Sequence, residues 1–311
     1  MRIVEDALKQ PLVEQTSVAL GFFDGVHKAH QTVIGFAVEA AEEKGLVPAV
    51  FTFKTTTSQP KSKSGYKYIL TERLKYEMLK RCGTELAAVM DFEEVEEYSA
   101  EDFILEILAK KLNAKAVSFG YDFRFGKNAA GDADLLKALC ERAGIYFYLV
   151  GAVSDGRRPI SSTRIREYLQ DGKIAEANRL LGYSYCFDGE VIKGEKIGSK
   201  IGFPTINQRF EPQCVVPKHG VYISEIALGN EVYLGVTNIG VKPTVNDENQ
   251  NDGESHKTCA ETHILGFKGD LYGKNIVVSL KAFLRPEQKF ENLDKLKEQI
   301  QKDIDIAKSL K

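Results

Sequence analysis

The sequence predicts two domains of different fold class. The first is an N-terminal α/β domain built on a doubly wound parallel sheet, and the second is an all-β domain, a small antiparallel β-barrel closed by a C-terminal helix. Up to Val150, short apolar segments alternate with amphipathic helical ones, which is typical of a parallel sheet covered on both faces. From Gly182 onward, short alternating segments with frequent glycines replace this pattern. We place the domains at 1–183 and 184–311, a division that suits the length of the chain.

Each half has its own set of expected elements. In the N-terminal half we expect strands at 17–23, 46–53, 86–90, 114–119 and 145–150, and helices from about residue 30 to Lys44 and at 72–81, 100–112 and 132–143. In the C-terminal half we expect strands at 187–193, 221–228, 232–239, 259–265 and 275–284. The last helix has a continuous apolar stripe, interpreted as packing over the barrel, that consists of Phe290, Leu293, Leu296, Ile300, Ile304 and Ala307.

Composition excludes several classes of protein. A net charge of −2 provides no field that would steer the chain onto nucleic acid or an anionic membrane, so any anion site must be local. The five cysteines are widely spaced and include no CxxC pair, which argues against a disulfide framework and a zinc site. No signal peptide and no apolar run of membrane-spanning length is present. We expect a cytoplasmic protein whose partners are small molecules; no oligomeric state follows.

The segment from Leu20 to His30 is the most informative one. An apolar strand ends in a turn and a helix begins, and backbone N–H groups at such a junction commonly hold a phosphate. His27 and His30 lie one helical turn apart and can reach the same bound group. The turn residues that we expect beside the phosphates are Gly21, Phe22, Asp24 and Gly25. The segment resembles the (H/T)xGH signature of nucleotidyltransferases; the alternative is a helix start with two surface histidines.

Two further loops leave strand ends on the same edge of the predicted sheet. The segment 120–126 interleaves aromatic residues with Asp122 and Arg124, so it could stack a planar ring, or it could pack on its own sheet. The segment 161–166 opens a helix with hydroxyl groups and two arginines, which suits a polyphosphate. Ligands of open parallel sheets bind beyond the carboxyl ends of the strands, so this convergence supports a nucleotide site.

The predicted barrel carries a second candidate site. Gly194, Gly198 and Gly202 would let backbone N–H groups approach phosphates closely. Thr205 and Asn207, two residues apart on one strand, offer neutral oxygens on one face, which suits Mg²⁺ bound together with ATP phosphates. Glu261 interrupts an otherwise apolar strand, either as a structural acid with a partner or as a general base for a hydroxyl nucleophile.

In order along the chain, these segments resemble the prokaryotic bifunctional riboflavin kinase/FMN adenylyltransferase family, also called FAD synthetase. The resemblance covers most of the chain. It rests on GFFDGVHKAHQ, GYDFRFGK, ISSTRIREYLQDG, LLGYSYCFDGEVIKG, GFPTIN, GVY, NIGVKPTV, ETHILGF, DLYGK and FLRPEQKF. It implies an N-terminal domain that joins FMN to AMP from ATP and releases pyrophosphate. It also implies a C-terminal six-stranded kinase barrel that makes FMN from riboflavin and ATP with Mg²⁺.

The resemblance also implies residue roles. His27 and His30 match the histidines that hold the ATP phosphates, and Glu261 matches the base that takes the proton of the ribityl 5′-hydroxyl. Thr205 and Asn207 match the Mg-ATP pair of the family's PTAN motif, written PTIN here. The remaining matches are the second phosphate motif, Ser162, Thr163 and Arg166; the flavin-contacting loop, Asp122, Phe123 and Phe125; and an arginine near the flavin or phosphate, Arg285.

The sequence departs from the family pattern in three places. Ala29 stands where HxGH has glycine. The alanine costs on the order of 1 kcal/mol if that position needs a positive φ or a close approach to phosphate, and nothing if the position is plainly helical. The Asp-Pro-His-Pro-like turn is replaced by 53–60, followed by Lys61, Lys63 and Lys67, which we interpret as a solvated loop or a lysine lid. Ser199 stands where arginine is common.

Three hypotheses of different class follow. The first is a bifunctional enzyme. The second is a riboflavin kinase whose N-terminal domain binds nucleotide or flavin with little transferase activity. The third is a non-catalytic flavin sensor, which would not need an ATP–Mg²⁺ site and a base together.

Overall fold

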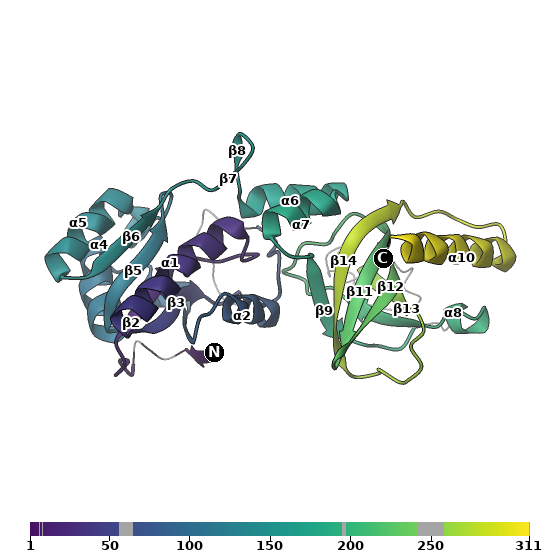
Figure 1. Ribbon diagram of the computed structural model, residues 1–311, viewed down its shortest axis with the longest axis horizontal. Coiled ribbons are helices and arrows are strands. Elements are labelled where there is room, and N and C mark those ends of the chain that lie inside the picture. Colours follow the sequence, from purple (N-terminus) through teal and green to yellow (C-terminus); the bar gives the residue numbers. More distant parts are fainter. Residues whose placement is uncertain (6, 8, 56–64, 195–196, 242–257, 311) are drawn as a thin grey trace. The chain divides into compact units, whose positions relative to one another are not determined.

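The chain is described by a computed structural model that covers residues 1–5, 7, 9–55, 65–194, 197–241 and 258–310 (Figure 1). It divides into two compact units. The first, called the N-terminal unit, comprises residues 1–68 and 72–162. The second, called the barrel unit, comprises residues 69–71 and 163–311. The two units are described separately below.

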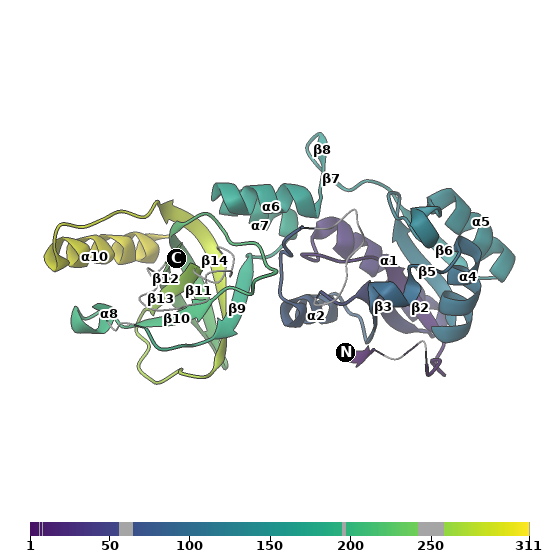
Figure 2. The same ribbon diagram turned by 180° about the vertical axis from the view of Figure 1, so that it is seen from behind.

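The N-terminal unit contains a parallel sheet of six strands in the order β1-β4-β3-β2-β5-β6. Figure 2 labels four of these strands, β2, β3, β5 and β6. Five of them confirm the predicted strands to within three residues at each end: β2 (Thr16–Leu20), β3 (Val47–Phe53), β4 (Leu86–Met90), β5 (Ala114–Gly120) and β6 (Tyr146–Val150). The sixth, β1 (Arg2–Val4), was not predicted because three residues carry too little pattern. A two-stranded ribbon follows the sheet, β7 (Ser154–Asp155) and β8 (Arg158–Pro159).

Helices cover both faces of this sheet, as the alternation predicts. On one face, the Ser118 hydroxyl of β5 donates to the Val33 carbonyl of α1 (Lys28–Lys44) at 2.7 Å. On the other, the core packs against η2 (Phe103–Lys111), a turn of π-type helix that continues α4 (Ala100–Asp102), and α5 (Ala133–Ala143). Further helices of the unit are α2 (Glu72–Arg81), α3 (Phe92–Val95) and η3 (Lys127–Ala129).

The strand order places a topological switch point between β2 and β5. From β2 the chain proceeds to β3 and β4 on one side, and it later returns through β5 to β6 on the other. Ligands of open parallel sheets bind where the order reverses, beyond the carboxyl ends of the strands. The histidine motif follows β2 directly, and the loop 120–126 follows β5. Both predicted motifs therefore leave the sheet at its switch point.

The barrel unit is built on an antiparallel sheet of six strands in the order β10-β13-β12-β11-β14-β9. The strands are β9 (Cys186–Glu190), β10 (Thr205–Arg209), β11 (Gly220–Leu228), β12 (Glu231–Val241), β13 (Thr258–Ile264) and β14 (Asn275–Arg285). The Gln208 amide of β10 nearly closes the barrel, donating to the Gly189 carbonyl at 2.8 Å and to the Ile276 carbonyl at 2.7 Å. Ser224, Thr237 and Thr262 form a buried chain of hydroxyls at 2.8 and 2.9 Å inside it.

Helices complete the barrel unit. These are α6 (Ser162–Asp171), α7 (Ile174–Leu181), α8 (Ile197–Lys200) and α10 (Leu293–Ser309). The Asn178 side chain ties α7 to the barrel, donating to the Leu280 carbonyl at 3.0 Å and accepting from the Tyr185 amide at 2.7 Å. Residues 163–183 therefore pack with the barrel. In the sequence, the change from helical to strand-like patterning lies later, between residues 183 and 184. The domain boundary given there stays a prediction.

The C-terminal helix packs over the barrel, as predicted, but its apolar stripe is shorter than expected. Ile304 and Ala307 are buried and join a cluster with Val221, Ile223 and Val236 of β11 and β12. Leu293 is exposed, because it is the first residue of α10 and extends beyond the strands that the helix covers. The predicted continuous stripe is therefore wrong at its N-terminal end. No helix in the described ranges is long and apolar enough to traverse a bilayer.

Candidate active sites

The turn that follows β2 is held in an unusual backbone conformation. Phe23, Gly25 and Val26 have φ values of 52°, 78° and 35°, in the left-handed region that non-glycine residues rarely adopt. Such strain persists only where surrounding contacts enforce it, and it gathers at functional sites. Three side chains supply hydrogen bonds here: Thr52 to the Phe22 carbonyl at 3.0 Å, Gln31 to the Val26 carbonyl at 2.8 Å and Ser162 to the Asp24 carbonyl at 2.9 Å.

His27 and His30 lie together at the start of α1. His27 is the N-cap, and its Nδ1 accepts from the His30 amide at 3.4 Å. The two rings stack with centroids 3.6 Å apart, and His27 is buried while His30 is half-buried. A helix N-terminus favours an anion through its unpaired N–H groups and its dipole. The structure thus brings both predicted histidines to one place suited to a phosphate.

Ala29, the departure from the HxGH pattern, is the second residue of α1. It is not among the residues with positive φ, so its conformation is helical and open to any residue. The strain that would follow from a left-handed position is absent at Ala29. Compared with alanine, glycine at this position would have one advantage, which is that the backbone could approach a phosphate more closely.

The aromatic loop that follows β5 divides into two parts. Phe125 is buried in the core and packs against Phe103 with ring centroids 5.4 Å apart, so this ring has the packing role that the alternative interpretation expects. Phe123 is half-buried, and Asp122 is exposed. Asp122 and Phe123 are therefore the members of the predicted flavin loop that remain available to a ligand.

The residues of the second phosphate motif are divided between the two units along the chain. Ser162 begins α6 and belongs to the N-terminal unit, where it contacts the histidine turn through the Asp24 carbonyl. Thr163 is exposed and Arg166 is half-buried, and both belong to the barrel unit. Arg164, the other arginine of the motif, is buried, and its Nε donates to the Tyr168 hydroxyl at 3.2 Å.

Lys54 stands where the family's Asp-Pro-His-Pro-like turn would begin. Its ammonium forms ion pairs with Glu5 and Asp91, both at 3.2 Å. The hydrogen bond that the Lys54 ammonium donates to Asp91 is the main cause that raises the pKa of Lys54, which keeps the side chain cationic. Residues 56–64, including Lys61 and Lys63 of the predicted lid, lie outside the described residues. Lys54 is thus held by acids of its own unit.

The barrel brings the predicted kinase residues together on neighbouring strands. In the register of β10 and β13, Asn207 lies directly opposite Glu261, and Thr205 lies opposite His263. On its other side Glu261 lies opposite Asn238 of β12. Thr262 points into the barrel with Thr237, and successive side chains alternate, so Glu261 and its cross-strand neighbours lie on the outer face.

Sequence reasoning missed residues that complete this outer face. Asn238 donates to a Glu287 carboxylate oxygen at 3.2 Å, and His263 holds the Pro204 carbonyl through Nδ1 at 2.8 Å. A side chain on Gly240 would collide with the Glu287 carboxylate at 1.9 Å. The sequence segments NIGV (238–241) and PEQ (286–288) contain the polar residues concerned. That these residues lie side by side depends on strand register, which sequence spacing alone does not specify.

The described residues of the glycine-rich segment before β10 pack closely. Residues 197–200 form the short helix α8, and Gly202 follows with φ 92°, its amide donating to the Ser199 carbonyl at 3.3 Å. A Cβ on Gly194 would lie 2.6 Å from the amide nitrogen of Asn207, and one on Gly198 would lie 2.3 Å from the Phe203 carbonyl. Gly194 and Gly198 are therefore required for close packing around the PTIN strand.

The donor set of this outer face fits Mg²⁺ bound with a nucleotide. In the described part of the chain no group of three or more His, Cys, Asp or Glu residues could form a cage for a metal by itself. Mg²⁺ commonly takes one or two protein oxygens and completes its shell with phosphates and water. The Thr205 hydroxyl and the Asn207 amide oxygen offer two such ligands, and Gly194 leaves room beside Asn207.

Arg285, a predicted flavin or phosphate ligand, makes a bidentate salt bridge to Asp303 of α10. Its Nε lies 3.1 Å from both carboxylate oxygens, and its Nη2 lies 2.8 Å from Oδ2. Nη1 donates to the Pro286 carbonyl at 3.1 Å. The Asp303 side chain is 2% exposed and that of Arg285 is 19% exposed, so water screens this pair little. The arginine therefore anchors α10 to the end of β14.

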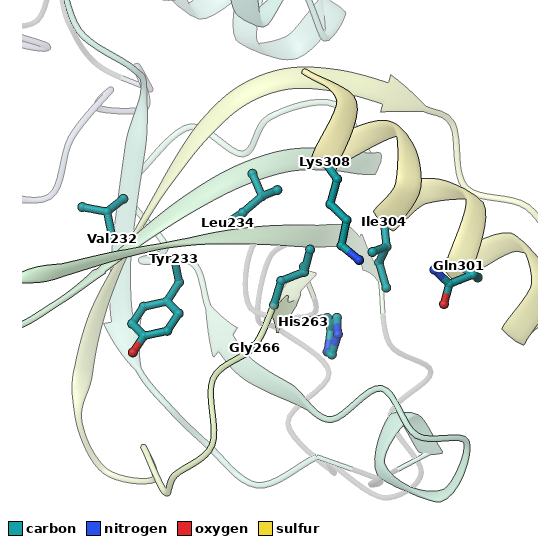
Figure 3. Close-up of a pocket in the computed structure, with 9 residues that line it drawn as sticks. Val232, Tyr233, Leu234, His263, Gly266, Gln301, Ile304 and Lys308 are labelled. Atoms are coloured by element: carbon teal, nitrogen blue, oxygen red, sulfur yellow. The ribbon is translucent and has the colours of Figure 1, made fainter. Parts of the chain in front are cut away.

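A cavity of about 520 Å³ opens between α10 and the adjoining ends of β12 and β13 (Figure 3). Polar and apolar groups contribute nearly equally to its walls, which include Leu234, His263, Leu265, Ile304 and Lys308. His263 is two residues from Glu261 on β13, so the cavity borders the kinase residues.

Comparisons with known proteins cover both halves of the chain. A family model described as FAD synthetase matches residues 9–164, and one described as riboflavin kinase matches residues 181–311. The chain is 37% identical to the bifunctional riboflavin kinase/FMN adenylyltransferase of Bacillus subtilis (strain 168), covering 92% of this chain and 89% of that protein. It is 34% identical to the Escherichia coli (strain K12) protein of the same name, covering 95% and 93%.

Among solved structures, a crystal structure described as a macrolide-efflux protein from Streptococcus pneumoniae matches with a TM-score of 0.84 and 28% identity. The match covers 99% of this chain and 98% of that one, so both units share their fold with it. The sequence matches cover both units and most of the length of their relatives. The chain therefore belongs to the family of bifunctional riboflavin kinase/FMN adenylyltransferases.

Proposed function

We propose that the chain phosphorylates riboflavin with ATP to give FMN in the barrel unit, and adenylylates FMN with a second ATP to give FAD and pyrophosphate in the N-terminal unit. The observation that carries the proposal is the direct opposition of Asn207 and Glu261 across β10 and β13. A Mg-ATP ligand and a general base are the two groups a kinase for an alcohol must bring together. Membership of the family supports both reactions.

In the kinase reaction, the ribityl 5′-hydroxyl oxygen attacks the γ-phosphorus of ATP. The bond from that phosphorus to the bridging oxygen breaks, and ADP leaves. Glu261 accepts the hydroxyl proton, a general-base role that suits a carboxylate placed beside the nucleophile. Thr205 and Asn207 would hold Mg²⁺ with the phosphates. When bound, the ion neutralises charge on the transferring phosphoryl group.

In the adenylyl transfer reaction, a phosphate oxygen of FMN attacks the α-phosphorus of ATP and pyrophosphate leaves. His27 and His30 would donate hydrogen bonds to the oxygens on which negative charge develops, where preformed donors contribute most. The turn residues Gly21, Phe22, Asp24 and Gly25 would cradle the phosphates together with Ser162, which contacts the Asp24 carbonyl. Thr163 and Arg166, which follow Ser162 in the sequence, stay predicted members of the phosphate motif. Asp122 and Phe123 would contact the flavin.

A second candidate is a riboflavin kinase whose N-terminal unit transfers adenylyl groups weakly. One observation favours it: the segment after β3 lacks the family's turn, and Lys54 there is occupied by Glu5 and Asp91. The helical position of Ala29 argues against backbone strain as a second ground for it. Incubating the protein with riboflavin, ATP and Mg²⁺ and separating FMN from FAD chromatographically distinguishes the two. Accumulation of FMN with no FAD would select the second candidate.

A further inference from the structure

Helix α2 carries a lysine on its buried face. Lys75 is 3% exposed and lies among Leu74, Met78 and Leu79, which are the other buried residues of the helix. Its ammonium donates to the Phe53 carbonyl at 2.7 Å and to the Thr52 hydroxyl at 3.4 Å. Both acceptors belong to the last two residues of β3. The ammonium thus lies at the carboxyl end of the sheet.

Among the residues that the structure describes, Lys75 has no ion-pair partner within 4 Å. The charges that act on it are Glu72 of its own helix and Asp24 of the histidine turn; the Tyr76 ring lies 5.6 Å away, and β3 contributes only neutral oxygens. Burial is the main cause that lowers the pKa of Lys75 to about 8. A buried cation without a counter-ion costs free energy, whereas methionine would fill the same apolar face without that cost.

The contacts of Lys75 extend to the histidine turn. The Thr52 hydroxyl that accepts from Lys75 itself donates to the Phe22 carbonyl at 3.0 Å. Phe22 immediately precedes the left-handed residues Phe23, Gly25 and Val26, which lead into His27. A rigid connection therefore runs from the ammonium through Thr52 to the strained backbone that sets the position of the histidine pair.

We propose that Lys75 is a positioning residue for adenylyl transfer: through Thr52 and the ends of β2 and β3, its buried ammonium fixes the turn that presents His27 and His30. This inference rests on the proposed function of the N-terminal unit. The charge of Lys75 has a second, electrostatic effect. A cation close to the turn raises the positive potential where the phosphates of ATP would bind. A lysine on an apolar helix face is thereby explained by function rather than by packing.

The test compares full-length variants in which only these contacts change. Lys75→Met removes the ammonium and keeps the length of the side chain, and Lys75→Arg keeps the charge. Thr52→Val removes the intermediate hydroxyl at nearly constant volume. Lys80→Met, at an exposed position of the same helix, is the matched control. FAD formation from FMN and FMN formation from riboflavin are measured for each variant, with folding followed by circular dichroism.

We expect Lys75→Met to lower kcat for FAD formation by about ten- to a hundredfold, the scale at which small displacements of catalytic groups act. FMN formation should stay at the wild-type rate, and so should both rates of Lys80→Met. Thr52→Val should lower FAD formation in the same direction. Lys75→Arg should recover much of the rate and keep it above pH 8, where the wild type loses its charge and activity declines.

Two results would overturn the inference. One is wild-type FAD formation by Lys75→Met. The other is a decrease in FAD formation by Lys75→Met that is proportional to its loss of folded protein, while FAD formation by Thr52→Val stays at the wild-type rate. Absence of FAD formation by the wild type itself would instead contradict the proposed function, so the two failures are distinguishable.

Discussion

Asn207 and Glu261 lie directly opposite each other on the antiparallel strands β10 and β13, on the outer face of the barrel. Directly opposed residues have Cβ atoms about 5 Å apart, so an amide oxygen and a carboxylate can act on one bound substrate. Asn207 is buried, whereas Glu261 is half-buried and accessible to a ligand. This pair connects nucleotide binding with proton removal in the proposed kinase reaction.

Glu261→Gln should abolish FMN formation and leave FAD formation from supplied FMN intact. Loss of a general base removes about two to four powers of ten in rate. Glu231→Gln, at an exposed position of β12, is the control and should match the wild type. Riboflavin phosphorylation by Glu261→Gln near the wild-type rate would show that Glu261 is a structural acid.

Thr205→Ala and Asn207→Ala should each weaken the use of Mg-ATP by the kinase, because each removes a neutral oxygen from a sparse metal shell. The measurement is KM for ATP at varied Mg²⁺ concentration. Riboflavin binding without ATP, followed by flavin fluorescence, should change little. An equal loss of riboflavin affinity would place these residues in the flavin pocket instead.

Asp303→Ala should destabilise the barrel unit by about 3–5 kcal/mol, because it leaves the largely buried guanidinium of Arg285 without its counter-ion. Urea unfolding followed by circular dichroism measures this change. Asp305→Ala, at an exposed position of the same helix, should have little effect. If Arg285 acts mainly on the flavin, Asp303→Ala would alter riboflavin affinity and leave the free energy of unfolding unchanged.

Lys75 should give the free energy of unfolding a specific pH dependence. Its pKa is about 8 in the folded protein and near 10.5 when exposed, so between these values the unfolded chain binds more protons. Stability then rises with pH in this window, since the cost of the buried charge is fully present below pH 8 and lost as the pH approaches 10.5. The stability difference between Lys75→Met and wild type should therefore shrink over this range; a constant difference would contradict the low pKa.

Much of the fold was predictable because local signals agreed with the tertiary structure. Lys44 and Gly45 predicted the end of α1, where Gly45 is left-handed, and Asp132 caps α5 as its position suggests. The π-type hydrogen bonding of η2 was not visible in a helical pattern, and β1 was too short to show alternation. Strand register, which sets Asn207 against Glu261, depends on the closed barrel rather than on local sequence.

Packing decided the remaining differences. Asn178 ties α7 to β14, although the composition changes only after that helix. Phe125 and Arg285 both lie in motifs that suit ligand binding. In the structure Phe125 is buried in the core, and Arg285 forms an ion pair with Asp303. Lys75 was not singled out from the sequence, because its contacts with Thr52 and Phe53 follow from the placement of α2 against β3.

His27→Ala together with His30→Ala should lower FAD formation at least about a hundredfold, the effect of losing donors to the transition state. FMN formation from riboflavin should persist, since the barrel unit has its own nucleotide residues. Helix α1 keeps its remaining contacts, which circular dichroism would verify. FAD formation near the wild-type rate would make the histidine pair a structural helix start.

Complementation between two variants tests the central claim, that one chain performs both reactions at separate sites. Glu261→Gln and the double histidine variant are each given riboflavin, ATP and Mg²⁺, alone and mixed, and the FAD formed is measured by chromatography. Neither variant alone should convert riboflavin to FAD, and the mixture should do so, because FMN released by one is adenylylated by the other. A mixture that forms no FAD, although the wild type does, would contradict two independent sites.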